Sequence, residues 1–206
     1  MVGEGVLHEC LNHKEVEQVL VLGRKSCGYT HPKLKEIVHA NLYDLSSIES
    51  QLSNYNACYF CLGTTSIGKN EEEYTKISYT LTMHTASTLS KLNKDMTFCY
   101  VSGAGTSDTK KTMWSRVKSR TENDLIKLPF KQVFNFRPGY MQPTPGLKNS
   151  LSAYKYVGWL YPLFRLTMPG FVTTLKEVGL AMINATLHGY KINFIEVKDI
   201  ISLSKK

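Results

Sequence analysis

Hydrophobic residues along this chain form short continuous runs that alternate with longer segments of helical spacing. Continuous apolar runs bounded by turn residues predict buried strands; they occupy residues 18–22, 36–40, 56–62, 97–101, 131–136 and 192–197. Apolar residues spaced three or four apart predict amphipathic helices, which cover residues 2–11, 44–52, 70–92, 112–128 and 174–187. Apolar strands that alternate with helices are typical of a parallel sheet covered on both faces. The pattern therefore predicts an α/β fold with a doubly wound, mostly parallel sheet.

Residues typical of helix ends support three of these helices. Asn70 is a favourable N-cap residue, and the glutamates at 71–73 complement the helix dipole in the first turn. Thr174 and Glu177 have the spacing of a capping box. Pro129 is expected to stop the helix at 112–128.

Length and composition fit one globular domain, residues 1–206, with 42% hydrophobic and 20% charged residues. The net charge of +8 favours an anionic partner, which includes a phosphate-bearing cofactor, nucleic acid or an acidic membrane surface. No apolar run reaches the length of a membrane span, and no secretory leader is seen.

The five cysteines are an odd number without the spacing of a disulfide framework, which predicts a reducing compartment. We therefore expect a cytoplasmic protein. Cys58 and Cys61 form a lone C-x-x-C, but residues three apart on a strand point to opposite faces. We interpret them as buried apolar residues rather than a zinc or redox site. The histidines show no metal-ligand grouping, so no metal site is predicted.

Three turns directly follow predicted strands, at residues 23–25, 63–65 and 102–106. In a doubly wound sheet, ligands bind at the carboxyl ends of the strands, near the point where the winding direction switches. The position of these turns therefore predicts a ligand site at that edge of the sheet.

Three residues at and after the end of one predicted strand have a distinctive spacing: Ser102, Trp114 and Lys118. Ser102 ends the strand at 97–101, Trp114 follows twelve residues later, and Lys118 lies four further on, on the same helix face. The spacing resembles the Ser-Tyr-Lys frame of short-chain dehydrogenases/reductases, with Trp114 in the place of the tyrosine that exchanges the proton. An indole N–H does not ionise near neutral pH. The resemblance implies an atypical site in which Ser102 polarises a carbonyl, Trp114 packs against nicotinamide or substrate, and Lys118 binds the nicotinamide ribose.

Other segments resemble the Tat-interacting-protein-like oxidoreductases, nucleotide-binding relatives of the sugar-nucleotide epimerases. Cys-Leu-Gly-Thr-Thr at 61–65 matches the loop where the fourth strand of that group passes the cofactor. Residues 22–24 match the end of its second strand, and Arg-Pro-Gly at 137–139 matches the turn after its sixth. The resemblance covers essentially the whole chain and implies a Rossmann-like, NAD(P)-binding domain. The residues that it places at the cofactor are Gly3, Arg24, Lys25, Asn41, Leu42, Leu62, Gly63, Thr64, Thr65, Lys118, Pro138 and Gly139.

The chain begins where the Gly-rich loop of this family would be finishing. Gly3 fits the third glycine of G-x-x-G-x-x-G, while the first two glycines and the strand before them are absent. That strand is central in the family's sheet, so its absence would leave two apolar strand edges unpaired. We expect a chain that lacks its natural start, with weakened pyrophosphate binding at the helix N-terminus.

Arg24 and Lys25 favour NADP(H) as the cofactor, with NAD(H) as the less favoured alternative. Enzymes that prefer NAD place an acidic residue at this strand end to accept from the ribose 2′-hydroxyl, and the sequence offers no nearby carboxylate. A guanidinium pairs with a 2′-phosphate through two parallel hydrogen bonds. By the resemblance, Asn41 and Leu42 lie by the adenine, and Gly63 lets the backbone approach the adenosine ribose.

These features predict an NADP(H)-dependent oxidoreductase that acts on a small-molecule carbonyl or hydroxyl compound. The alternative is a nucleotide-binding regulatory or interaction protein that has lost turnover. A replacement proton donor would be Tyr140, Tyr154 or Tyr156, among which the sequence does not select.

Residues 140–172 are expected to form a small substrate or lid region. Within it, residues 151–168 are unusually aromatic, and Pro162 is expected to kink or end a helix. This segment predicts a pocket for a bulky apolar substrate, a peripheral contact with a membrane or partner, or a helix that only covers the sheet end.

The basic residues and the long helices each suggest a macromolecular partner. Basic residues favour nucleic-acid binding only weakly, because they point to different helix faces and no groove-reading motif accompanies them; they are Lys110, Lys111, Arg116, Arg120, Lys127 and Lys131. The family resemblance implies a homodimer that pairs the helices at 70–92 and 112–128.

Overall fold

Parallel strands joined by helices run through the chain, as the hydrophobic pattern predicts. The computed structural model describes residues 1–110, 112–149 and 161–206. Unit 1 comprises Met1–Ala40, Pro138–His188 and Glu196–Lys206, and unit 2 comprises Asn41–Arg137 and Gly189–Ile195. The α/β class with mostly parallel strands is confirmed.

Unit 2 is built on a four-stranded sheet with the strand order β3-β4-β5-β8. Its strands are β3 (Ala57–Phe60), β4 (Thr97–Val101), β5 (Gln132–Arg137) and β8 (Phe194–Glu196), whose last residue begins a segment of unit 1. Its helices are η1 (Ser46–Gln51), α2 (Glu71–Thr75), η2 (Lys76–Thr80), α3 (Leu81–Leu92) and α4 (Met113–Leu125). The strand β4 pairs in parallel with β3 and β5, so that Tyr100 lies opposite Phe60 and Asn135.

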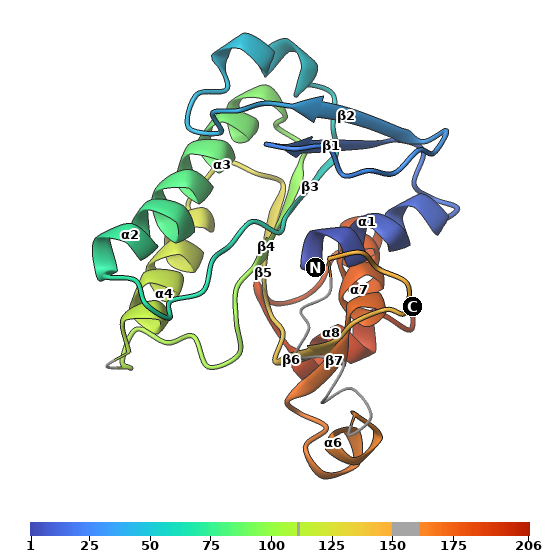
Figure 1. The fold of residues 1–206 in the computed structure, drawn as a ribbon, viewed down its shortest axis with the longest axis vertical. Coiled ribbons are helices and arrows are strands. Elements are labelled where there is room, and N and C mark those ends of the chain that lie inside the picture. Colours follow the sequence, from blue (N-terminus) through green and yellow to red (C-terminus); the bar gives the residue numbers. More distant parts are fainter. Residues whose placement is uncertain (111, 150–160) are drawn as a thin grey trace. The chain divides into compact units, whose positions relative to one another are not determined.

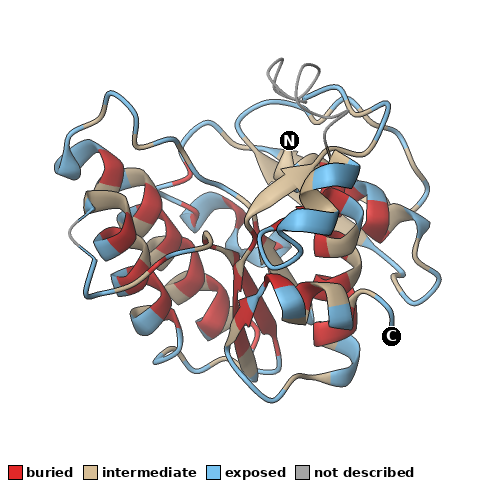
Figure 2. Cartoon of the chain, turned by 90° about the horizontal axis from the view of Figure 1, so that it is seen from below, coloured by how far each residue is buried: buried red, intermediate tan, exposed pale blue. Residues whose placement is uncertain are grey.

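The core of unit 2 centres on β4, whose first four residues are buried. The Phe98 ring lies 6.0 Å from the Phe60 ring and 5.0 Å from the Phe130 ring, between centroids. In unit 2 the buried residues lie mainly in β4 and β5 and on its helices, where Figure 2 shows them in red beside exposed positions in blue. This sheet therefore supports the loops that follow its strands.

Consecutive helical segments α2, η2 and α3 follow the predicted cap at Asn70. The Asn70 side chain accepts from the Glu73 N–H at 2.9 Å, and the Glu73 carboxylate accepts from the Asn70 N–H at 3.2 Å. The predicted cap is thus confirmed as a capping box. The middle segment η2 is π-helical, and its Ser78 carbonyl accepts from the Thr121 hydroxyl of α4 at 3.2 Å. The helices α3 and α4 lie side by side (Figure 1).

Unit 1 contains two parallel pairs of strands and four helices among its described residues. The strands are β1 (Val19–Gly23) with β2 (Leu34–Val38), and β6 (Tyr140–Gln142) with β7 (Val172–Thr174). The helices are α1 (Val2–Asn12), α6 (Tyr161–Thr167), α7 (Leu175–His188) and α8 (Val197–Leu203).

The helices α1 and α7 pack closely because glycines face the partner helix. A Cβ at Gly5 would lie 2.8 Å from the Leu175 Cβ, and one at Gly179 would lie 2.7 Å from the Glu9 Cγ. Both are too close for a side chain, so only glycine allows this approach. Helix α7 begins at the predicted capping box, which is confirmed by hydrogen bonds of 3.0 and 2.8 Å between Thr174 and Glu177.

Several predicted boundaries are wrong. The strand predicted at 36–40 begins earlier, as β2, the helix predicted at 44–52 is the shorter 3-10 helix η1, and the helix predicted at 112–128 ends at Leu125. The strand predicted at 192–197 ends at Glu196, because Glu196 and Asp199 form a capping box that starts α8. Pro162, expected to kink or end a helix, lies near the start of α6, which continues to Thr167. The short strands β6 and β7 were not predicted.

Candidate active site

Ser102 directly follows β4 in unit 2 and is buried. Its backbone N–H donates to the Phe136 carbonyl at 2.7 Å, so the residue continues the pairing of β4 with β5. Its hydroxyl lies 3.2 Å from the Thr106 hydroxyl, which itself donates to the Gly103 carbonyl at 2.7 Å. The turn after β4 therefore holds the Ser102 oxygen in place at the carboxyl end of the sheet.

Trp114 lies in the first turn of α4, with its ring beside the glycine turn that follows Ser102. A Cβ added at Gly103 or at Gly105 would lie 3.9 Å from the indole ring. Gly105 has φ +83°, a left-handed conformation that favours glycine. The structure thus brings Trp114 to the same loop as Ser102, as the predicted frame requires. Its contact with nicotinamide stays a prediction.

Lys118 completes the frame one helical turn after Trp114. Its Nζ lies 3.2 Å from the Val101 carbonyl oxygen and 3.5 Å from the Tyr100 hydroxyl, and 5.1 Å from the centroid of the Tyr100 ring. Burial lowers the pKa of Lys118 to about 8, while the Glu122 carboxylate partly opposes this shift. The ammonium therefore sits against the end of β4, next to the peptide group that leads into Ser102.

Tyr100 is a neighbour of the frame that sequence analysis missed. Its side chain points from β4 toward Lys118 and is 1% exposed. Burial raises its pKa well above the ordinary range, with smaller effects of Tyr74 and Glu122 in the same direction. The alternation of side chains along a strand could have placed Tyr100 on the same face as Ser102.

A buried ion pair behind Lys118 was also missed. Glu122 is 0% exposed, and its two carboxylate oxygens accept from the Arg137 guanidinium at 2.9 and 2.6 Å. The guanidinium carbon lies 4.7 Å from the centroid of the Phe194 ring. The pair joins α4 to the last residue of β5. The sequence did offer a signal that Glu122 lies near the frame. It follows Lys118 by four residues, which puts both side chains on one helix face.

The loop after β3 carries four of the residues predicted to contact the cofactor. Leu62, Gly63 and Thr65 are exposed, and Thr64 is half-buried. A Cβ added at Gly63 would meet no protein atom within 4 Å. Packing among the described residues therefore does not require glycine at this position, and the contact of Gly63 with the adenosine ribose stays a prediction.

Asn41 and Leu42, predicted beside the adenine, begin unit 2. The Asn41 side-chain oxygen accepts from the Tyr43 N–H at 3.1 Å, which is an Asx turn. Leu42 is buried. Both side chains thus have a local structural role, and their contact with adenine stays a prediction.

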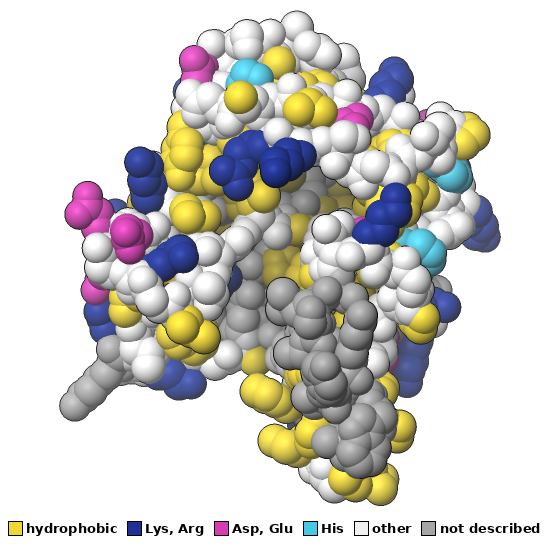
Figure 3. Space-filling view, viewed as in Figure 1, with side chains coloured by type: hydrophobic (Ala, Val, Ile, Leu, Met, Phe, Trp, Pro, Cys, Tyr) yellow, Lys and Arg dark blue, Asp and Glu magenta, His cyan; other side chains and the backbone are white. Residues whose placement is uncertain are grey.

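Arg24 and Lys25 directly follow β1 in unit 1, and both side chains are exposed. A Cβ at Gly23 would lie 3.2 Å from the Lys25 carbonyl oxygen, because the chain turns tightly here. Figure 3 shows Lys and Arg side chains gathered on the visible face near the β1–β2 sheet. Gly3 is exposed in the first turn of α1.

The expectation that no carboxylate lies near this turn is wrong. Glu36, on β2, accepts from the Ser26 hydroxyl at 2.7 Å and from the Cys27 N–H at 2.5 Å. These hydrogen bonds, the one from Cys27 first, hold the pKa of Glu36 below its ordinary value. Glu36 therefore fixes the loop that follows Arg24 and Lys25.

Pro138 and Gly139 form the turn after β5, and Tyr140 begins β6. Pro138 is buried, and a Cβ added at Gly139 would overlap the Phe171 carbonyl oxygen. Packing within unit 1 is thus sufficient reason for this glycine. Tyr140, one of the proposed replacement acids, donates from its hydroxyl to the Gln142 side chain at 2.9 Å, and burial raises its pKa.

Within one unit, the structure brings together Ser102, Trp114 and Lys118. The other predicted cofactor residues belong partly to unit 1 and partly to unit 2, and their convergence on one ligand stays a prediction. Tyr154, Tyr156, Lys111 and most of the aromatic segment 151–168 lie outside the described residues.

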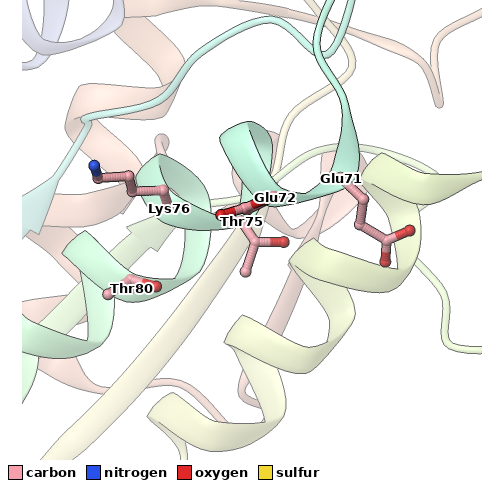
Figure 4. A pocket seen from close by; sticks show the side chains of 5 residues that line it. All are labelled: Glu71, Glu72, Thr75, Lys76 and Thr80. Atoms are coloured by element: carbon pink, nitrogen blue, oxygen red, sulfur yellow. The ribbon is translucent and has the colours of Figure 1, made fainter.

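A separate pocket of about 460 Å³ lies on α2 and η2 (Figure 4). Its lining is polar and includes no residue of the Ser102–Trp114–Lys118 frame; it consists of Glu71, Glu72, Thr75, Lys76 and Thr80. Glu71 also accepts from Arg116 at 2.9 Å. The pocket therefore stands apart from the predicted chemistry.

Three of the basic residues considered for nucleic-acid binding have acidic partners in unit 2. Arg116 pairs with Glu71, and Arg120 and Lys127 both lie near Asp124, at 3.9 and 2.7 Å. In the part of the chain that the structure describes, no three His, Cys, Asp or Glu side chains gather as metal ligands. No described helix is both long and apolar enough to cross a membrane.

Comparison with known proteins gives two curated relatives, both from Scheffersomyces stipitis. "Protein FMP52-1, mitochondrial" is 25% identical over 220 residues, covering 100% of this chain and 95% of the relative. "Protein FMP52-2, mitochondrial" is 22% identical over 205 residues, covering 92% and 87%. No family model matches the chain. Because both relatives are named as mitochondrial, the expectation of a cytoplasmic location is wrong; the cysteine count indicates only a reducing environment.

Solved structures with the same fold include short-chain dehydrogenases and epimerases. The chain is similar to the Helicobacter pylori ADP-L-glycero-D-manno-heptose-6-epimerase, with TM-score 0.65, 14% identity, and coverage of 100% of this chain and 78% of that one. It is also similar to a short chain dehydrogenase family protein from Francisella tularensis, with TM-score 0.64, 12% identity, and coverage of 94% of this chain and 90% of that one. A third similar structure is the Bordetella bronchiseptica enzyme WbmG in complex with NAD, with TM-score 0.65, 12% identity, and coverage of 99% of this chain and 74% of that one.

These structures establish the class of fold. The chain has the Rossmann-like fold of the short-chain dehydrogenases and epimerases, as the sequence predicts. It spans between 63% and 90% of the length of such neighbours.

Proposed function

We propose that this chain is an NADP(H)-binding oxidoreductase of the short-chain dehydrogenase type, with an atypical site in which Trp114 replaces the catalytic tyrosine. The observation that carries the proposal is the frame itself: the Lys118 ammonium lies 3.2 Å from the Val101 carbonyl, at the strand end that leads into Ser102, with Trp114 against the adjoining glycine turn. The likeness in fold to WbmG, solved with NAD, supports a nicotinamide nucleotide as the ligand.

The preference for NADP(H) rests on the turn after β1. Arg24 and Lys25 are exposed there and available to a 2′-phosphate. Each oxygen of the nearby Glu36 carboxylate already accepts a hydrogen bond from the loop, from Ser26 and Cys27. This engagement favours a structural role for Glu36 over binding of the ribose hydroxyls that NAD would offer.

We further propose that the substrate is a bulky apolar carbonyl or hydroxyl compound. Support comes from exposed apolar side chains in the region predicted as a lid: Leu163, Leu166, Met168 and Phe171. The names of the two relatives support a mitochondrial location for the activity. A homodimer through the long helices of unit 2 stays part of the proposal.

A nucleotide titration tests the cofactor. Trp159→Phe leaves Trp114 as the one indole of the chain, so its emission reports on the frame directly. We expect saturable quenching by NADPH at lower concentration than by NADH. Arg24→Ala should weaken NADPH about 10- to 100-fold, as expected for the loss of a charge-assisted contact, and leave NADH unchanged. Lys94→Ala, which removes an exposed lysine of unit 2, is the matched control. Absence of saturation by either nucleotide would refute the proposal.

A second candidate function, nucleotide binding without turnover, is favoured by the indole at position 114. Trp114→Tyr separates the two functions, with NADPH oxidation measured against a panel of aldehydes and ketones. If the exchange creates activity that the wild type lacks, the natural protein is a silent binder. If it abolishes an existing activity, Trp114 belongs to a working enzyme.

A further inference from the structure

We propose that Lys118 is the acid–base residue of this site: its ammonium group donates a proton to the oxygen of the bound carbonyl compound and recovers it in the reverse reaction. This inference rests on the proposed function, because it requires a reduced nicotinamide nucleotide and a carbonyl compound at the frame. It assigns to Lys118 the role that the missing tyrosine has in related enzymes.

The position of the Lys118 amine fits this role. An ammonium group has three N–H donors. The structure directs two of them at acceptors on β4, the Val101 carbonyl at 3.2 Å and the Tyr100 hydroxyl at 3.5 Å. These contacts fix Nζ at the strand end beside Ser102 and leave the third donor for a ligand. The residue as a whole is half-buried, so the protein does not enclose it completely.

No other member of the frame can exchange a proton near neutral pH. The Ser102 hydroxyl and the Trp114 indole do not ionise there. Tyr100 carries the tyrosine hydroxyl that contacts Lys118, but it is 1% exposed and its pKa is raised by burial. It therefore stays protonated and out of reach of the substrate, and serves as an acceptor for the amine.

The charged and titratable groups around Lys118 affect its pKa. They are Tyr100 on β4, Glu122 on α4, Arg137 on β5 and, behind Tyr100, Tyr74 on α2. Burial lowers the pKa of Lys118 to about 8, and the Glu122 carboxylate, which pairs with Arg137, opposes this shift. An acid with a pKa near the working pH is mostly protonated and still gives up its proton readily.

The carbonyl carbon gains a hydride from the reduced nicotinamide, which becomes oxidised. The electron pair of the C=O π bond forms the new O–H bond with the proton that leaves Nζ, giving the alcohol. Lys118 is left as a neutral amine, and water returns its proton. Ser102 orients the oxygen throughout, as a hydrogen-bond donor.

The first test needs no turnover. Lysines are reductively methylated with ¹³C-formaldehyde, and their resonances are followed by NMR against pH in the wild type, Lys118→Arg and Lys94→Arg. We expect the resonance that disappears in Lys118→Arg to titrate near pH 8, well below the ordinary value of a lysine. Lys94→Arg, at an exposed position, should leave that resonance in place. A Lys118 resonance that titrates with the exposed lysines would overturn the inference.

The second test is the pH profile of NADPH oxidation with 9,10-phenanthrenequinone as the carbonyl probe. We expect a rate that is constant below pH 8 and falls about tenfold per pH unit above the pKa of Lys118. Lys118→Arg keeps the charge but holds its proton too tightly to donate it. It should bind NADPH within about threefold of the wild type and lose at least about 100-fold in rate, while Lys94→Arg matches the wild type.

Failure of this inference is distinguishable from failure of the proposed function. If NADPH does not bind the wild type, the proposed function fails and the role of Lys118 falls with it. If NADPH binds and the probe is reduced, but Lys118→Arg keeps the wild-type rate and profile, only the role of Lys118 is overturned. If NADPH binds but the probe is not reduced at any pH, the role of Lys118 is overturned and nucleotide binding without turnover is favoured over the oxidoreductase.

Discussion

The ion pair between Glu122 and Arg137 should be the most sensitive point of unit 2. Glu122 is 0% exposed, and both its oxygens accept from the guanidinium, at 2.9 and 2.6 Å. Glu122→Gln keeps the shape of the side chain but leaves the Arg137 charge without its carboxylate. Breaking one partner of a buried pair costs about 3–5 kcal/mol. For a chain of this size that lowers the melting temperature by about 2–4 °C per kcal/mol.

Urea unfolding followed by circular dichroism measures this cost. Glu71→Gln is the matched control, because it breaks the Glu71–Arg116 pair of 2.9 Å, in which the side chains are 57% and 43% exposed. An exposed pair contributes about 0–1 kcal/mol. Replacing Arg137 by Met in the Glu122→Gln background should recover part of the loss, since no unpaired buried charge remains. A cost for Glu122→Gln no larger than that for Glu71→Gln would refute this reasoning.

Three further predictions concern the cap, two glycines and the lysine. Asn70→Ala should cost about 1 kcal/mol in urea unfolding, the usual value of an N-cap; an unchanged midpoint would contradict it. Gly139→Ala should lower the free energy of unfolding far more than Gly63→Ala, because a Cβ at 139 overlaps backbone and one at 63 meets no protein atom. Gly63→Ala should instead weaken nucleotide binding in a titration. The pKa of Lys118 falls from an ordinary 10.5 to about 8 on folding, so folding disfavours its charged form. That cost is fully present below pH 8 and fades as the pH rises to 10.5. The wild type should therefore gain stability relative to Lys118→Met over this range. A difference in unfolding free energy that stays constant with pH would argue against the pKa shift.

Features that depend on neighbouring residues could be predicted from the sequence. The apolar run at 97–101 became β4, and the caps at Asn70 and Thr174 start helices where local hydrogen bonding dictates. The frame of Ser102, Trp114 and Lys118 could be predicted for the same reason, because its residues lie on consecutive elements, one strand, one turn and one helix.

Features that depend on register or distant contacts could not be predicted. Glu36 reaches the loop after β1 only because β1 and β2 pair in a particular register, with Val21 opposite Glu36. The strands β6 and β7 have three residues each, too few for a periodic signal. At Glu196, the apolar run suggested a longer strand, while a capping box formed by two carboxylate residues starts a helix.

We propose NADP(H) as the ligand of this protein, with Lys118 at its nicotinamide end and Arg24 at its 2′-phosphate. A crystal structure of the complex with NADPH tests it most directly. We predict the Arg24 guanidinium within about 3 Å of the 2′-phosphate oxygens, the usual distance of a charge-assisted hydrogen bond, the backbone of Gly63 against the adenosine ribose, and the nicotinamide ring beside Lys118. A nucleotide bound elsewhere, or one that touches only one of these residues, would contradict the account.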